Sequence, residues 1–173
     1  DISDAAVQRG LKTVGGSLDR LVSKEKMTAA DRDATLARIN ATTDKSKLAA
    51  CDLVIEAATE NEELKVKILR DLCAGLKPSA LVATNTSSIS ITRLAASTDR
   101  PDRFIGMHFF NPVPVMALLE LIRGLQTSDD TVAKAEAFAK RVGKALVIQR
   151  QAQSRAADQL AKSGEGARIA ADT

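Results

Sequence analysis

The chain has 173 residues, of which 45% are hydrophobic and 27% are charged, and its formal net charge is +3. These values are typical of a globular protein with one domain, or one domain and an appendage. The weak positive charge and the absence of Trp and Tyr argue against nucleic-acid binding. No apolar run is long enough to span a bilayer and no signal peptide is evident, so we expect a cytoplasmic protein or one of an organelle matrix.

The N-terminal part of the chain predicts two helices. Apolar residues recur at helical spacing from residue 3 to residue 23, although Gly15 and Gly16 weaken this pattern. Thr28 is the predicted N-cap of a second helix that runs through Ile39, and Asp31 would complete a capping box.

From residue 52 onward, short apolar runs alternate with helical patterns. The expected strands are 52–56, 81–84, 104–107, 116–122 and 145–148, and the expected helices are 62–76, 91–96 and 129–142. Strands separated by helices imply crossover connections, so the fold class is α/β with a mostly parallel sheet. Nearly continuous apolar strands imply that helices cover both faces of this sheet. Residues 149–173 break the pattern and predict a polar tail, helical or disordered.

Polar residues follow three of the expected strands. Glu56 and Glu60 follow the first, the segment 85–88 follows the second, and His108 and Asn111 follow the third. Ligands of open parallel sheets bind beyond the carboxyl ends of the strands. Each cluster alone fits ordinary turn and N-cap residues. All three together, with the only histidine of the chain among them, predict a shared site.

His108 and Glu120 are the candidate acid–base pair. Glu120 lies twelve residues after the histidine, inside an apolar run, and Pro112 and Pro114 stiffen the segment between them. Either residue alone fits a structural role. Together they predict an imidazole that a carboxylate orients and keeps basic, able to take a proton from a substrate hydroxyl.

Other classes of site find less support in the sequence. No G-x-S-x-G, Walker A or G-x-G-x-x-G sequence occurs in the 173 residues. A metal site would need a second histidine or a cysteine near His108, so no metal is expected. Cys51 and Cys73 form no CxxC pair and are interpreted as buried thiols in a reducing compartment.

Three segments, 52–61, 84–88 and 108–120, resemble the L-3-hydroxyacyl-CoA dehydrogenases, including the 3-hydroxybutyryl-CoA dehydrogenases. The resemblance covers about residues 1–148. It implies a Rossmann-type domain that binds NAD, an oxidoreductase of fatty-acid β-oxidation or short-chain acyl-CoA metabolism, and an acyl-CoA substrate. Members of the family also carry a C-terminal helical domain with dimer contacts, so a homodimer is expected for the complete protein.

By this resemblance, His108 is the base that takes the 3-hydroxyl proton and, in the reverse direction, the acid that protonates the ketone. Glu120 is its orienting partner. Ser87 and Asn111 would place the substrate oxygen and the nicotinamide end of NAD, and Ser87 would touch both substrate and cofactor.

The resemblance also assigns residues that bind the rest of the cofactor and the coenzyme. Glu60 and Lys65 match positions that line the NAD site, and Asp1 would accept hydrogen bonds from the adenosine ribose. Ser17 and Lys24 match positions where the family contacts coenzyme A, and a lysine suits a CoA phosphate.

Two departures from the family shape the expected domains. The family's first strand and its G-x-G-x-x-G loop would precede Asp1 by about 20 residues, and residues 149–173 do not match its helical domain. Residues 1–148 are therefore interpreted as a partial domain that binds NAD poorly by itself and turns over slowly or not at all. A non-catalytic relative of the same fold stays open. A β-hydroxyacid dehydrogenase fits the α/β pattern but not the His-Phe-Phe-Asn-Pro run.

Overall fold

The computed structural model describes residues 1–150, which form two compact units, one ending at Lys47 and one beginning at Leu48. Neither helix of the first unit contains a buried residue. The elements are α1 (Asp4–Ser23), α2 (Ala29–Ala37), β1 (Leu53–Glu56), α3 (Glu62–Cys73), β2 (Leu81–Thr84), α4 (Ile91–Ala96), β3 (Phe104–Phe109), β4 (Leu118–Arg123), α5 (Asp129–Arg141), β5 (Ala145–Arg150) and two 3-10 helices, Lys45–Leu48 and Pro101–Arg103.

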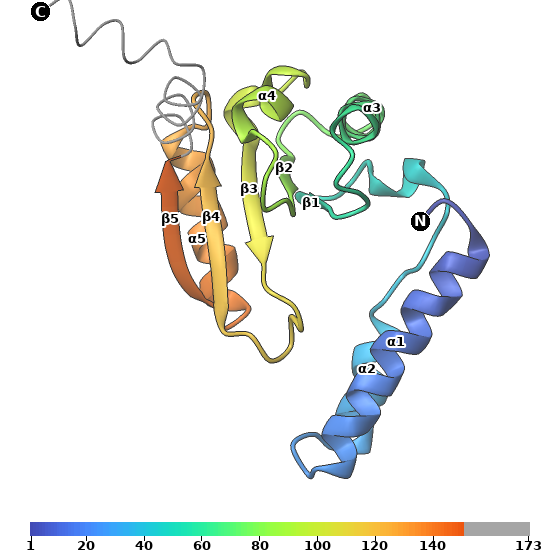
Figure 1. Ribbon diagram of the computed structural model, residues 1–173. Coiled ribbons are helices and arrows are strands. Elements are labelled where there is room, and N and C mark those ends of the chain that lie inside the picture. Colours follow the sequence, from blue (N-terminus) through green and yellow to red (C-terminus); the bar gives the residue numbers. More distant parts are fainter. Residues whose placement is uncertain (151–173) are drawn as a thin grey trace, which may run out of the picture. The chain divides into compact units, whose positions relative to one another are not determined.

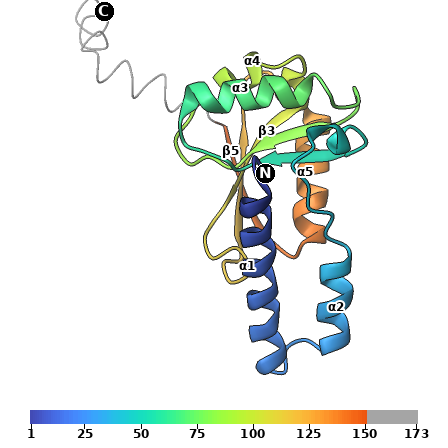
Figure 2. The same cartoon turned by 90° about the vertical axis from the view of Figure 1, so that its right-hand side faces the viewer.

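The first unit is a pair of helices, α1 and α2, that lie side by side (Figures 1 and 2). The central glycines do not interrupt α1. Thr28 caps α2 as predicted, because its hydroxyl oxygen accepts the backbone N–H of Asp31 at 3.0 Å. An ion pair of 3.0 Å between Arg32 and Asp19 links the two helices.

The second unit is built on a five-stranded sheet in the order β1-β2-β3-β4-β5, counted within the described residues. The pairs β1–β2, β2–β3 and β4–β5 are parallel, whereas β3 and β4 are antiparallel. Figure 1 shows the reversal, because the arrow of β3 points opposite to those of β4 and β5. The short connection between β3 and β4, unlike the helical crossovers elsewhere, makes this one pair antiparallel.

Apolar side chains cover both faces of the sheet, because neighbouring residues of a strand point to opposite faces. On β2, Val82 packs in one cluster and Ala83 in the other; on β3, Phe104 and Ile105 divide in the same way. Helices α3 and α4 contribute to the first cluster and α5 to the second (Figure 2). This two-sided burial fixes the strand register that positions the polar residues at the strand ends.

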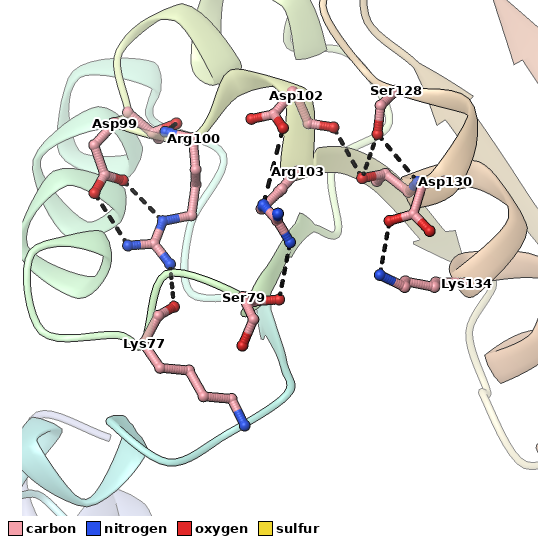
Figure 3. Close-up of polar contacts among 11 residues, drawn as sticks. Lys77, Ser79, Asp99, Arg100, Asp102, Arg103, Ser128, Asp130 and Lys134 are labelled. Carbon is pink, nitrogen blue, oxygen red and sulfur yellow. Dashed lines mark hydrogen bonds and ion pairs between the residues drawn. The ribbon is translucent and has the colours of Figure 1, made fainter.

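A buried arginine, Arg100, ties the end of α3 to the start of β3 (Figure 3). Its guanidinium donates to the carbonyls of Lys77 at 2.7 Å and Cys73 at 2.8 Å. It also pairs with Asp99, and these hydrogen bonds hold the pKa of the Asp99 carboxyl below its ordinary value. Carbonyls at a helix end lack partners inside the helix, so Arg100 acts as a cap for α3.

Gly106 of β3 is required by the packing of the sheet. A Cβ at this position would lie 2.9 Å from both Ile122 Cβ and Ile91 Cδ1. We expect Gly106→Ala to lower the free energy of unfolding by about 1–3 kcal/mol, because an overpacked core must shift its neighbours. Urea unfolding followed by circular dichroism measures this loss. Gly75→Ala is the matched control, since its new Cβ would meet only one atom, at 3.8 Å. Equal stability of the two variants would contradict the prediction.

Strand β5 runs to Arg150, two residues beyond the expected strand end at Ile148. Gln149 and Arg150 therefore belong to the sheet and not to the predicted polar tail. The rest of that tail, 151–173, lies outside the described residues.

Candidate active site

The antiparallel pairing of β3 and β4 places His108 directly opposite Glu120. The sequence predicts that β3 ends at Met107, but the strand continues to Phe109 and so includes the histidine. His108 Nδ1 lies 2.8 Å from Glu120 Oε2. The predicted proximity of these two residues is therefore confirmed, and it follows from strand register.

The two side chains of the pair are partly shielded from solvent, with exposed fractions of 19% for His108 and 21% for Glu120. An ionised carboxylate only accepts hydrogen bonds, so the contact requires the proton on Nδ1. In the neutral ring, Nε2 then carries the free lone pair. This arrangement leaves the outer nitrogen able to accept a proton from a ligand.

Gln149 of β5 holds the second oxygen of the same carboxylate. Its Nε2 donates to Glu120 Oε1 at 3.1 Å. Side-chain contacts thus connect His108, Glu120 and Gln149 across three adjacent strands, β3, β4 and β5, although the strand register pairs Gln149 with Ile122. The sequence did not indicate Gln149, because it falls where the sheet pattern fades into polar residues.

The segment that follows His108 carries an aromatic ring and an exposed amide. The rings of His108 and Phe110 have centroids 4.6 Å apart and planes tilted by 51°. Asn111 is exposed, and its peptide bond to Pro112 is cis. Asn111 therefore lies two residues beyond the end of β3, in the loop that leads towards β4.

The carboxyl ends of β1 and β2 bring further predicted residues to the same edge of the sheet as His108. The exposed Glu60 accepts a hydrogen bond of 2.8 Å from the hydroxyl of Thr86, a buried residue of the predicted polar segment 85–88. Ser87 is exposed at the end of β2. Asn85 Oδ1 accepts the backbone N–H of Phe109 at 2.8 Å, so the ends of β2 and β3 are tied together.

Lys65, which by the resemblance matches a position lining the NAD site, lies inside the protein. Its side chain is fully buried, and its Nζ lies 2.5 Å from Glu56 Oε2 and 3.2 Å from Thr84 Oγ1. Thr84 donates to the same carboxylate oxygen at 2.7 Å, and Ala58 donates its backbone N–H to the other at 2.7 Å. The positive charge of Lys65 is therefore matched by Glu56 inside the protein.

Three predicted site residues, Asp1, Ser17 and Lys24, belong to the first unit. The carboxylate of Asp1 accepts the N–H of Ile2 at 2.6 Å. The hydroxyl of Ser17 donates to the carbonyl of Thr13 at 3.0 Å, and Lys24 is exposed at the C-cap of α1. These three residues therefore belong to the first unit, and the acid–base pair belongs to the second.

Within residues 1–150, no three His, Cys, Asp or Glu side chains form a group that could hold a metal ion. No helix in that range is both long and apolar enough to cross a membrane.

The sequence matches a known family over most of its length. The model for the NAD-binding domain of 3-hydroxyacyl-CoA dehydrogenase matches residues 1–152. A 3-hydroxybutyryl-CoA dehydrogenase from Bradyrhizobium diazoefficiens is 52% identical over 148 residues, which are 86% of this chain and 50% of that protein. The fatty acid oxidation complex subunit alpha from Acinetobacter baylyi is 43% identical over 148 residues, 86% of this chain and 21% of that protein.

Solved structures agree with these matches. The (S)-3-hydroxybutyryl-CoA dehydrogenase from Ralstonia eutropha is 61% identical with a TM-score of 0.86, covering 87% of this chain and 53% of that one. The 3-hydroxybutyryl-CoA dehydrogenase from Escherichia coli K12 is 41% identical with a TM-score of 0.84, covering 87% and 32%. The matched part of the chain spans 50% of the Bradyrhizobium diazoefficiens protein and 21% of the Acinetobacter baylyi protein.

Proposed function

Because the chain belongs to the 3-hydroxyacyl-CoA dehydrogenase family and matches its NAD-binding domain, we propose that it carries the acid–base pair of an NAD-dependent enzyme. The reaction is oxidation of an L-3-hydroxyacyl-CoA at C3 and its reverse, reduction of a 3-oxoacyl-CoA. The observation that carries this proposal is the contact of 2.8 Å between the only histidine and Glu120.

The proposed role of His108 is to move one proton at Nε2. In the oxidation, Nε2 takes the proton of the 3-hydroxyl as the hydride leaves C3, and in the reduction it returns a proton to the ketone oxygen. NAD, when bound, supplies the acceptor or donor of that hydride. Glu120 stabilises the imidazolium that forms, because its carboxylate already accepts from Nδ1.

Polar side chains at the sheet edge that carries His108 support the assignment of the NAD site to this edge. Glu60 is a carboxylate held in place by Thr86, and a carboxylate is a suitable acceptor for ribose hydroxyls. Ser87 and Asn111 are exposed in the loops that follow β2 and β3, and we assign them to the substrate oxygen and the nicotinamide end. Lys65 is buried against Glu56, so we assign it a structural role. It would support the residues that line the NAD site without contacting NAD itself.

The first unit is assigned to the outer parts of the two ligands. Asp1 would accept the adenosine ribose hydroxyls, and this carboxylate favours NAD because NADP has a 2′-phosphate there. Lys24 and Ser17 would meet the phosphates of coenzyme A, for which an exposed lysine at the end of α1 is suited.

The proposed complete enzyme is a homodimer with a Rossmann-type cofactor domain and a second, helical domain. Support comes from the relatives, whose lengths are about twice that of the matched segment or more. The five strands described above would form part of the larger sheet of that cofactor domain.

A domain exchange tests the proposed reaction without relying on residues outside the match. Residues 1–148 would replace the matching segment of the Ralstonia eutropha enzyme, of which they cover 53%. The assay follows acetoacetyl-CoA reduction through the absorbance of NADH at 340 nm. We expect a rate within about tenfold of that of the parent enzyme, which corresponds to an activation free energy higher by about 1.4 kcal/mol at most. A folded, NADH-binding exchange protein without turnover would contradict the proposal and favour a non-catalytic relative.

A further inference from the structure

The loop between β3 and β4, residues 110–117, has little apolar burial to hold it. Val113, Val115 and Met116 expose 38%, 76% and 38% of their surface. The turn inside the loop rests on the carbonyl of Pro112, which accepts the N–H groups of Val115 at 2.9 Å and Met116 at 3.0 Å. A loop of this kind needs polar contacts with the rest of the fold to keep one conformation.

One lysine from a distant part of the chain supplies such contacts. Lys144 Nζ donates to the carbonyls of Val113 at 2.5 Å and Met116 at 2.6 Å. A charged donor makes shorter and stronger hydrogen bonds than a neutral one. One acceptor lies near the start of the turn and the other at its end, so this single ammonium group contacts both parts of it.

The end of α5 explains why Lys144 reaches the loop. Gly143 has a φ of +71°, its N–H bonds to the carbonyl of Lys140, and the N–H of Lys144 bonds to the carbonyl of Ala139. This pair of bonds is the Schellman motif, which ends the helix and reverses the chain. Ala145 then bonds through its N–H to the carbonyl of Ala117 and begins β5 beside the loop.

We propose that Lys144 is a positioning residue of the candidate site, which latches the loop that carries Asn111 and follows His108. Phe110, whose ring lies against the imidazole, and Asn111 are the first residues of that loop. Release of the latch would free both residues to move relative to the acid–base pair. The catalytic meaning of the latch rests on the proposed function, but the latch itself does not.

Hydrogen exchange in the 173-residue chain tests the latch without any substrate. In Lys144→Met, the amides of Val115 and Met116 should exchange at least about tenfold faster than in the unmodified chain, because the turn opens more often. The rates are read relative to the amides of Val82 and Ile105 in the core strands, so a general loss of stability cancels.

Conservative and surface substitutions distinguish a latch from a general structural role. Lys144→Arg keeps the charge and the donors and should restore slow exchange, whereas Lys134→Met, an exposed lysine of α5, should change nothing. The single imidazole gives a second readout, since its ring signals should shift in Lys144→Met only. If Lys144→Met does not fold, Lys144→Gln takes its place. Its exchange rates at Val115 and Met116, relative to those of the core amides, are then compared with the rates of Lys144→Arg.

Unchanged relative exchange in Lys144→Met, or equally fast exchange in Lys144→Arg, would overturn the latch. Neither readout involves turnover. Failure of the dehydrogenase proposal would therefore leave this result standing, and failure of the latch would leave the acid–base pair untouched.

Discussion

Replacing His108 by glutamine is expected to lower the rate of acetoacetyl-CoA reduction by about 10²- to 10⁴-fold, the usual contribution of a positioned acid–base group. Glutamine keeps a polar side chain that can donate to Glu120, but it has no nitrogen that takes up and releases a proton. The chain has no second histidine to take over this role. The affinity for NADH should stay nearly the same, because the role proposed for His108 is proton transfer at the substrate oxygen.

The measurement uses the exchange protein with the Ralstonia eutropha enzyme, in which rate and NADH binding are both accessible. Lys134→Gln on the exposed face of α5 serves as the control and should keep the full rate. If His108→Gln kept the rate of its parent, the assignment of the proton-transferring residue would be wrong. If NADH binding fell together with the rate, the residue would act mainly in holding the cofactor.

Replacing Lys65 by methionine is expected to destabilise the sheet unit by about 3–5 kcal/mol, because the substitution leaves the buried Glu56 without its partner. Both side chains are almost wholly buried, and the contact between them is 2.5 Å. Methionine fills a similar volume, so the loss comes from the uncompensated charge and not from a cavity. Glu56 also accepts the backbone N–H of Ala58, in the segment that leads to Glu60. The Lys65–Glu56 pair therefore also supports the part of the chain that we assign to the NAD site.

A double-mutant cycle with Glu56→Gln separates charge from packing. Lys65→Met with Glu56→Gln should unfold at higher urea than Lys65→Met alone, since no buried charge is left unpaired. Circular dichroism is the suitable probe, because the chain has no Trp or Tyr. The prediction is contradicted if the losses in the free energy of unfolding are additive in the double variant. It is also contradicted if Lys65→Met lowers that free energy by less than about 1 kcal/mol.

Much of the fold could be predicted because, in the second unit, the local sequence pattern agrees with the secondary structure that forms. Strand β2 and helix α4 match their predicted ranges, 81–84 and 91–96, residue for residue. Pattern alone could not place the ends of β3 and β4, since strand ends depend on pairing with partners far away in the sequence. The exposure of α1 and α2 could not be predicted either, because helical spacing does not reveal how much of a helix is buried.

The candidate site could be predicted in outline because the carboxyl ends of parallel strands meet at one edge. His108 and Glu120 were found from their residue types and spacing. Two residues that hold the site, Lys144 and Gln149, are of types common in turns and on surfaces, and only the tertiary structure brings them to it. The burial of Lys65 was missed for a related reason, because lysine is rarely buried unless paired.

Nitrogen-15 spectra of the one imidazole test the central claim most directly, because a single ring needs no assignment among histidines. We predict that the neutral ring of His108 carries its proton on Nδ1, held by Glu120, and leaves Nε2 bare, and that Glu120→Gln removes this preference. A ring protonated on Nε2 in the unmodified chain, or a spectrum unaffected by Glu120→Gln, would contradict the proposed acid–base pair.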